Sequence, residues 1–156
     1  MNRVRGNYVV SDDKSRLKVP EIVALMKQGF WCANYKPRKI ARLLKNSLWL
    51  GLYCKGELVG LARVITDKET VTTILDFIVD KAHQRQGHGS FLMSCLVEHP
   101  ALKKTAMSLG TQTGDRFFEK FGFERNGSMM HRWPALPPGV AITEEVIFSA
   151  KAKASK

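Results

Sequence analysis

The stretch from Thr72 to His99 constrains the fold most, because its hydrophobic period changes at a glycine-rich turn. From Ile74 to Val79 the residues are almost continuously apolar and β-prone, which predicts a strand buried on both faces. After Gly89, apolar residues recur at three- and four-residue spacing, which predicts a helix with one apolar face. The residues of that face are Phe91, Leu92, Cys95, Leu96 and His99.

The loop between these two elements, Gln84–Gly89, is called the glycine loop below. Gly87 and Gly89 allow a ligand to approach the backbone closely. Backbone amides of the turn and of the first helical turn, through Ser90, then point past the strand end without intrahelical partners. Such a corner is an anion site, although a purely structural turn explains the same residues.

A second segment lies about 30 residues further on, where Phe117–Phe123 predicts a short amphipathic helix that ends at Gly122. In this order and spacing, the two segments resemble the GCN5-related N-acetyltransferase (GNAT) superfamily. The resemblance covers roughly residues 30–132, and the segments 47–53 and 59–67 are similar to small single-domain bacterial members.

The resemblance implies an α/β (α+β) GNAT fold. Its central sheet is mixed and mostly antiparallel, with about six or seven strands flanked by about four helices, and its strands splay apart at the acetyl-CoA site. We expect a single acetyltransferase domain over residues 1–148 and a Lys/Ala-rich tail over residues 149–156. The implied activity is direct transfer of an acetyl group from acetyl-CoA to an amine, either a small molecule or a protein amino group.

The resemblance also implies cofactor-binding residues, with the pyrophosphate held by Gln84-x-x-Gly87-x-Gly89. At the position of Phe118 many members have a tyrosine that protonates the departing CoA thiolate, and phenylalanine has no proton to give. Loss of that proton donor leaves open a catalytically weak acyl-CoA sensor. The full set is Phe77, Ile78, Val79, Gln84, Arg85, Gln86, Gly87, His88, Gly89, Ser90 and Phe118.

Asp76 is the candidate catalytic carboxylate. If the hairpin before it pairs Thr66 with Val71, Arg63 lies opposite Ile74 and diagonal to Asp76 on one face. A buried charge needs a partner, so we expect an Arg63–Asp76 ion pair. A structural pair is the first interpretation of Asp76, and a general base for the acceptor amine is the second.

Trp31 and Tyr35 are candidates for substrate contact, because the resemblance places the connection between the first two helices on the acceptor side of the cleft. A tryptophan that anchors this loop to the core is the alternative for Trp31. His88 is either a phosphate contact or an exposed loop histidine. Trp49 and the C-terminal strand are candidates for a homodimer interface.

The formal net charge of +11 suggests nucleic acid, but its distribution argues against it. Lys and Arg outnumber Asp and Glu by 11 to 3 in residues 1–50, and by 5 to 6 in residues 51–100. No zinc site, helix-turn-helix or RNA motif accompanies the basic first third, so a basic nucleic-acid module is the weaker alternative. A positive field also attracts an anionic cosubstrate such as CoA.

Other features are typical of a cytoplasmic globular protein. No apolar run is long enough to span a membrane, and the first 20 residues are too polar for a signal peptide. Three widely spaced cysteines show no metal-binding pattern and are expected to be reduced core thiols, so we expect no metal.

The remaining elements follow from local patterns. We expect an edge strand at residues 8–11, a helix near Pro20 whose apolar stripe includes Phe30, and a helix from Pro37. Strands are expected at residues 48–54, 58–66, 70–79 and 105–109, followed by a helix capped by Asp115. The pattern further predicts a strand or hairpin turning at residues 126–127 and a strand or helix at residues 141–148.

Overall fold

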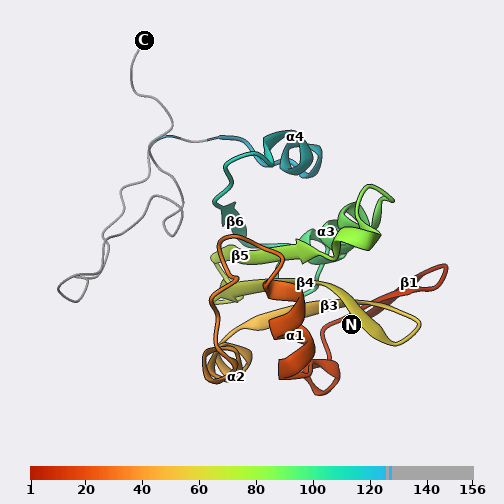
Figure 1. Ribbon diagram of the computed structural model, residues 1–156. Coiled ribbons are helices and arrows are strands. Elements are labelled where there is room, and N and C mark those ends of the chain that lie inside the picture. The colour runs from red at the N-terminus through yellow and green to blue at the C-terminus, as the bar shows by residue number, and fades with distance from the viewer. Residues whose placement is uncertain (126, 128–156) are drawn as a thin grey trace, which may run out of the picture. The chain divides into compact units, whose positions relative to one another are not determined.

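The computed structural model describes residues 1–125 and residue 127, and the expected elements at 126–127 and 141–148 and the tail at 149–156 fall wholly or partly outside them. The chain separates into two compact units, Met1–Leu109 and Gly110–Lys156. The first unit holds a six-stranded sheet in the order β1-β2-β3-β4-β5-β6 (Figure 1). The antiparallel strands β1 to β5 and the parallel β6 confirm the predicted mixed sheet.

The strands follow the predicted pattern closely, with one addition at the N-terminus. Tyr8–Ser11 is not an edge strand as expected, because the preceding residues form a further strand that pairs with it. Gly6, with φ of 57°, helps to turn this hairpin. The strands are β1 (Asn2–Arg5), β2 (Tyr8–Ser11), β3 (Leu48–Cys54), β4 (Glu57–Thr66), β5 (Val71–Val79) and β6 (Ala106–Leu109).

Prolines begin two of the helices, where the missing N–H costs nothing. Pro20 lies in the first turn of α1 and Pro37 is the first residue of α2. The α-helices are α1 (Val19–Met26), α2 (Pro37–Asn46), α3 (His88–Val97) and α4 (Asp115–Phe118). Short 3₁₀ turns are η1 (Lys14–Arg16), η2 (Lys81–His83) and η3 (Glu119–Phe121).

One face of the sheet packs on α1 and α2. Trp49 is fully buried there, and its Nε1 donates to the carbonyl of Leu43 at 3.2 Å, so the expectation that Trp49 serves a dimer interface is wrong. Phe30 was expected in the stripe of α1 but is 61% exposed, because the helix ends at Met26. Besides Trp49, buried members of this core include Ile22, Leu25, Met26, Ile40, Tyr53, Leu61 and Ile78.

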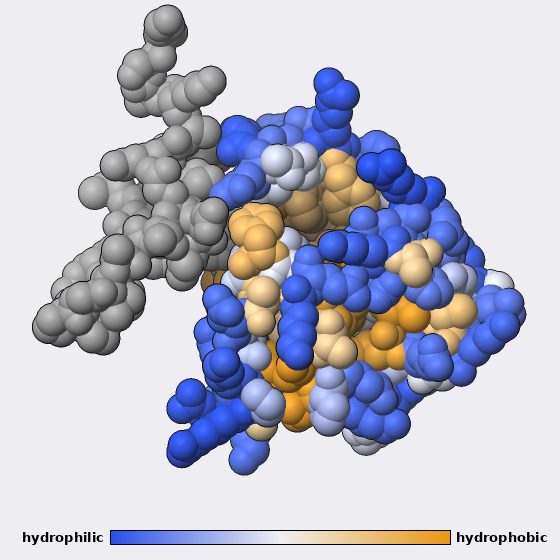
Figure 2. All heavy atoms as spheres, viewed as in Figure 1, coloured by the Kyte–Doolittle hydropathy of each residue, from blue (hydrophilic) through white to orange (hydrophobic). Residues whose placement is uncertain are grey.

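The opposite face of the sheet packs on α3. Leu50 and Ala62 alternate with the residues that face α1, and both are fully buried. Leu92, Met93 and Leu96 of α3 are equally buried. Figure 2 shows the outer surface in the same view as Figure 1, where hydrophilic residues surround a strip of apolar ones.

The turn between β4 and β5 fixes a register that differs from the expected one. The carboxylate of Asp67 accepts hydrogen bonds from the amides of Glu69, Thr70 and Val71. The Thr70 hydroxyl donates to the same carboxylate, and this bond together with the amide bonds lowers the pKa of Asp67. The bonds also keep Thr70 in the turn. Thr66 therefore pairs with Thr72 instead of Val71.

A bulge at Leu75 shifts the register again and brings the predicted ion pair together. Val64 pairs with Ile74, whereas the next pair is Arg63 with Asp76. A bulge re-aims the side chains that follow it, so Asp76 lies directly opposite Arg63 instead of diagonal to it. Arg63 Nε donates to Asp76 Oδ2 at 2.5 Å, and Asp76 is 1% exposed.

The end of β5 has strand neighbours that differ on its two sides. Residues Asp76–Val79 pair with β4 as far as Gly60. On the other side, the ladder with β6 runs from Val71 and Ala106 to Ile74 and Leu109, and continues no further within residues 1–125. This parting of β5 and β6 agrees with the predicted splay of the strands.

The second unit contains α4, η3 and a polar turn. The helix cap differs from the expected one, because Gly114 is the N-cap and Asp115 is the first helical residue. The Asp115 carboxylate instead accepts two hydrogen bonds from Arg125, at 2.7 and 2.8 Å. Gly122, with φ of 81°, ends the segment as predicted.

We predict that Asp76→Asn lowers the free energy of unfolding by about 3 kcal/mol, because it leaves the Arg63 guanidinium buried without a counter-charge. Urea denaturation measures the change. The matched control is Glu21→Gln in the exposed Lys18–Glu21 pair, which should cost less than about 1 kcal/mol. Equal and small effects of both substitutions would contradict a structural role for the buried pair.

Candidate functional site

Side-chain amides hold the glycine loop onto the end of β5. Gln84 Nε2 donates to the carbonyl of Val79 at 2.7 Å, and Gln86 Nε2 donates to the carbonyl of Ala82 at 3.0 Å. Arg85 and Gly87 both have positive φ, 58° and 78°. The loop therefore turns sharply between the strand and α3, and only Gly87 makes its turn without steric cost.

The loop ends at the N-terminus of α3, whose N-cap is Gly87. No acidic residue lies in the first helical turn. The amides of His88, Gly89 and Ser90 are among those that an α-helix leaves without an intrahelical acceptor, and the helix dipole is positive at this end. This end of α3 is therefore electrostatically suited to an anion.

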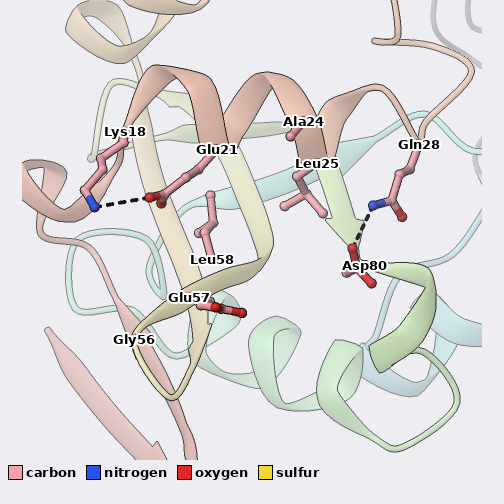
Figure 3. A pocket seen from close by; sticks show the side chains of 9 residues that line it. All are labelled: Lys18, Glu21, Ala24, Leu25, Gln28, Gly56, Glu57, Leu58 and Asp80. Atoms are coloured by element: carbon pink, nitrogen blue, oxygen red, sulfur yellow. Dashed lines mark hydrogen bonds and ion pairs between the residues drawn. The ribbon is translucent and has the colours of Figure 1, made fainter.

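Gln28, beyond the end of α1, anchors the beginning of the loop region. Its Nε2 donates to Asp80 Oδ2 at 2.7 Å, and its Oε1 accepts from the amide of Lys81 at 3.0 Å. Gln28 and Asp80, together with Glu21 and Glu57, line an open pocket of about 430 Å³ beside α1 (Figure 3). These hydrogen bonds connect the residues that follow β5 to the end of α1.

The β1–β2 hairpin contacts the start of α3. The Tyr8 ring stacks on His88, with ring centroids 3.6 Å apart, and its hydroxyl lies 2.9 Å from His83 Nδ1. His88 is only 8% exposed, so the expectation of an exposed loop histidine is wrong for it. Burial and the positive charges of Arg5 and His83 lower the pKa of His88, which favours its neutral form.

The second half of β5 passes beside the glycine loop. Ile78 and Val79 are buried, and Val79 is the residue whose carbonyl receives the Gln84 amide. Because the described β6 ladder ends at Ile74, the edge of β5 beyond it is not covered by that strand. Phe77 pairs with Ala62 on the β4 side.

The Arg63–Asp76 pair is part of a larger polar cluster beneath the loop between α1 and α2. Arg63 Nη1 donates to Ser47 Oγ at 3.2 Å, and its guanidinium lies 5.8 Å from the Trp49 ring. Tyr35 is half-buried, and its pKa is raised by burial and by the charge of Asp76. The predicted catalytic carboxylate and one of the two predicted substrate residues therefore belong to one electrostatic environment.

The other predicted substrate residue lies at the surface. Trp31 is 36% exposed and makes an edge-to-face contact with the exposed Phe30, at 5.1 Å between ring centroids. Tyr35 carries the Lys39 ammonium at 3.5 Å from its ring centroid. The loop therefore exposes two aromatic rings to solvent, and its half-buried Tyr35 lies near the buried Arg63–Asp76 pair.

Phe118 belongs to the second unit, as the last residue of α4. Its ring makes edge-to-face contacts with Phe117 and Phe123, at 5.0 and 6.1 Å between centroids. Thr111 Oγ1 accepts from the amide of Gly114 and shapes the turn before the helix. These ring contacts pack the end of α4 against Phe123.

In residues 1–125 and 127, no group of three or more His, Cys, Asp or Glu is arranged to hold a metal ion. The same residues contain no helix with the length and apolar character needed to cross a membrane. Cys32 and Cys95 are buried thiols, as expected for core residues, whereas Cys54 is half-buried.

A family profile described as acetyltransferase (GNAT) domain matches residues 45–125 of this chain. The chain belongs to the GNAT acetyltransferase family. Acetyl transfer with acetyl-CoA as cosubstrate is the activity of this family, so this GNAT acetyltransferase is an acyl-CoA-dependent enzyme by membership. The matched segment includes β3 to α4, and therefore both the glycine loop and Phe118.

Known proteins support the same assignment. Putative acetyltransferase FG08082 of Gibberella zeae is 29% identical over 117 residues, which are 62% of this chain and 66% of that protein. A GNAT-family structure from Xanthomonas campestris pv. campestris is 26% identical, with a TM-score of 0.75 over 84% of this chain and 96% of the other. A GNAT structure from Elizabethkingia anophelis with acetyl-CoA bound shares the fold, with 17% identity, a TM-score of 0.60, and coverage of 77% and 78%.

Sequence reasoning missed the residues that support the glycine loop from elsewhere in the chain. Arg5 and Tyr8 contact the end of the loop from the first hairpin. Gln28 contacts the residues between β5 and the loop from the end of α1. The charge of Arg5 and the amide of Gln28 are ordinary surface features in the sequence. Only the packing of the first hairpin against α3, and of the end of α1 against the end of β5, places them beside the loop.

Proposed function

We propose that this GNAT acetyltransferase binds acetyl-CoA with its phosphates on the glycine loop and its pantetheine arm along the second half of β5. The observation that carries the proposal is the juxtaposition of two features of the first unit. An N-terminus of α3 without acidic residues lies directly after a strand whose edge is left by β6 at Ile74. Acetyl-CoA supplies the acetyl group as a thioester.

The residues present fit such a cosubstrate. Amides from Gly87 to Ser90 are hydrogen-bond donors for phosphate oxygens, and the αL conformation of Gly87 lets the backbone approach them. The backbone N–H of Val79 is placed to bind an amide of a pantetheine arm, as an added strand would. The next amide, of Asp80, donates to Val59 of β4, and successive strand residues direct their backbone groups to opposite sides. Gln84 holds the strand end and the loop in a fixed relation for both interactions.

We assign Asp76 a positioning role instead of the role of general base. Arg63 occupies its Oδ2, and its 1% exposure leaves little access for an amine. The acceptor amine must still be neutral to attack a thioester, so its proton is taken by water in this proposal. The acceptor is an amine, of a small molecule or a protein, that contacts Trp31 and Tyr35.

Phe118 does not take part in proton transfer in this proposal. A thiol has a pKa near 8.5 and is a fairly good leaving group, so water can reprotonate it. Phe118 stands at the sequence position where many members of the family carry a tyrosine, and its ring offers no proton. A slow enzyme, rather than one that only senses acyl-CoA, is the expected consequence.

We predict that Gly89→Trp abolishes binding of acetyl-CoA, because an indole in the first turn of α3 blocks access to its amides. Isothermal titration with acetyl-CoA and with CoA measures the affinity, which should be micromolar in the unaltered chain. Glu98→Trp, at the exposed C-cap of the same helix, is the matched control and should bind normally. Binding that survives Gly89→Trp would overturn the proposed phosphate site.

We predict that Phe118→Tyr raises the turnover of acetyl transfer, because it restores a hydroxyl at the position of the usual proton donor. A positioned general acid contributes up to about 10²–10⁴-fold where protonation limits the rate. Release of CoA thiol over a panel of amines measures it, with the neighbouring Phe117→Tyr as control. Equal rates for both variants and the unaltered chain would show that thiolate protonation does not limit the reaction.

A further inference from the structure

The tip of the β1–β2 hairpin brings a guanidinium to the glycine loop. Arg5 is the last residue of β1 and lies opposite Tyr8 in the hairpin register. Its Nη2 donates to the carbonyl of Gly87 at 2.8 Å and lies 3.2 Å from His88 Nδ1. Arg5 therefore contacts the N-terminus of α3, although more than 80 residues separate them in the sequence.

These contacts fix the orientation of both partners. Arginine has N–H donors and no acceptor, so His88 Nδ1 accepts and the ring proton of neutral His88 lies on Nε2. The guanidinium carbon also lies 4.7 Å from the centroid of the Phe91 ring, one turn further along α3. The Tyr8 ring stacks on the imidazole of His88 and holds it in this orientation.

Arg5 retains donors for a further ligand. Within the described residues, its recorded hydrogen bonds all use Nη2, so the N–H groups of Nη1 and Nε are left for another acceptor. The residue is exposed, and the first turn of α3 has no acidic side chain to compete for it. The remaining donors therefore lie at the place where the proposed function puts the cosubstrate phosphates.

We propose that Arg5 is a phosphate-binding residue of this enzyme, which pins the Gly87 carbonyl with Nη2 and binds a phosphate oxygen of acetyl-CoA with its remaining N–H groups. The inference rests on the proposed function. It adds to the glycine loop a side chain from the first hairpin, outside the matched segment 45–125. A charge-assisted hydrogen bond of this kind is stronger than the neutral ones of the loop amides.

A clasp that only holds the hairpin onto the enzyme is the alternative, and the two roles differ in which ligands they affect. A phosphate-binding Arg5 changes the affinity for ligands that carry phosphate and leaves other ligands unaffected. A clasp changes the affinity for every ligand of the site, because it acts through the loop and the fold. The comparison of CoA with pantetheine, which has no phosphate, separates them.

The experiment measures dissociation constants of CoA and of pantetheine for the unaltered chain, Arg5→Gln, Arg5→Lys and Arg3→Gln by isothermal titration. Arg3 lies on the same exposed strand, so its loss removes the same charge without touching the glycine loop. We expect Arg5→Gln to weaken CoA binding roughly tenfold or more, with pantetheine unchanged. Arg5→Lys should be intermediate, because a single ammonium cannot span the carbonyl and a phosphate.

Unchanged CoA affinity in Arg5→Gln, or an equal loss in Arg3→Gln, would overturn the inference. A parallel loss for CoA and pantetheine in Arg5→Gln and Arg5→Lys would also overturn it and leave Arg5 as a clasp. Failure of the unaltered chain to bind CoA would instead overturn the proposed function, and the inference with it. Thermal unfolding of each variant without ligand shows whether the hairpin remains folded.

Discussion

The structure depends on a change that β5 makes at Leu75. Up to Ile74 the strand pairs with β4 on one side and β6 on the other. A single bulged residue then shifts the β4 register and coincides with the end of the β6 ladder. The bulge accounts for the pairing of Arg63 with Asp76, and the end of the β6 ladder leaves the second half of β5 without that neighbour within the described residues.

The ion pair and the open edge have different physical roles. Arg63 and Asp76 lie on the α1 and α2 face of the sheet, where they satisfy each other and leave no lone charge in the core. The open edge continues into the glycine loop, where Gln84 fixes the corner and Gly87 supplies the αL conformation. In the proposed function, backbone groups of this corner bind the cosubstrate, and the buried ion pair has a structural role.

Support for the loop comes from the end of α1 and from the first hairpin. Gln28 holds the residues before the loop, Asp80 and Lys81, to the end of α1. The Tyr8–His88 stack holds the end of the loop to the first hairpin. The net positive charge of the chain is concentrated near its ends, and Arg5 shows how charge from the first residues reaches the loop. The field around the loop is therefore built from parts of the chain that are distant in sequence.

The sequence predicted the elements whose signal is local. The strand, loop and helix between Ile74 and Val97, the proline-started helices and the Arg63–Asp76 pair were all expected and are confirmed. The register was wrong, because a turn stabilised by the Asp67 carboxylate and a bulge at Leu75 have no clear pattern of hydrophobicity.

The contacts that support the site could not be predicted from the sequence either. His88 was interpreted as a loop residue, and its burial under Tyr8 follows from an N-terminal strand whose exposed residues carry no hydrophobic period. Arg5 gave no signal of its own, since its role depends on a hairpin tip that reaches α3. Tertiary placement, not local propensity, decides such residues.

Amide hydrogen exchange with and without acetyl-CoA tests the central claim most directly. The account predicts added protection at the Val79 amide and at the amides from Gly87 to Ser90, with little change at α2 or at the turn between β3 and β4. Protection confined to the pocket beside α1, with the end of β5 and the glycine loop unchanged, would contradict it.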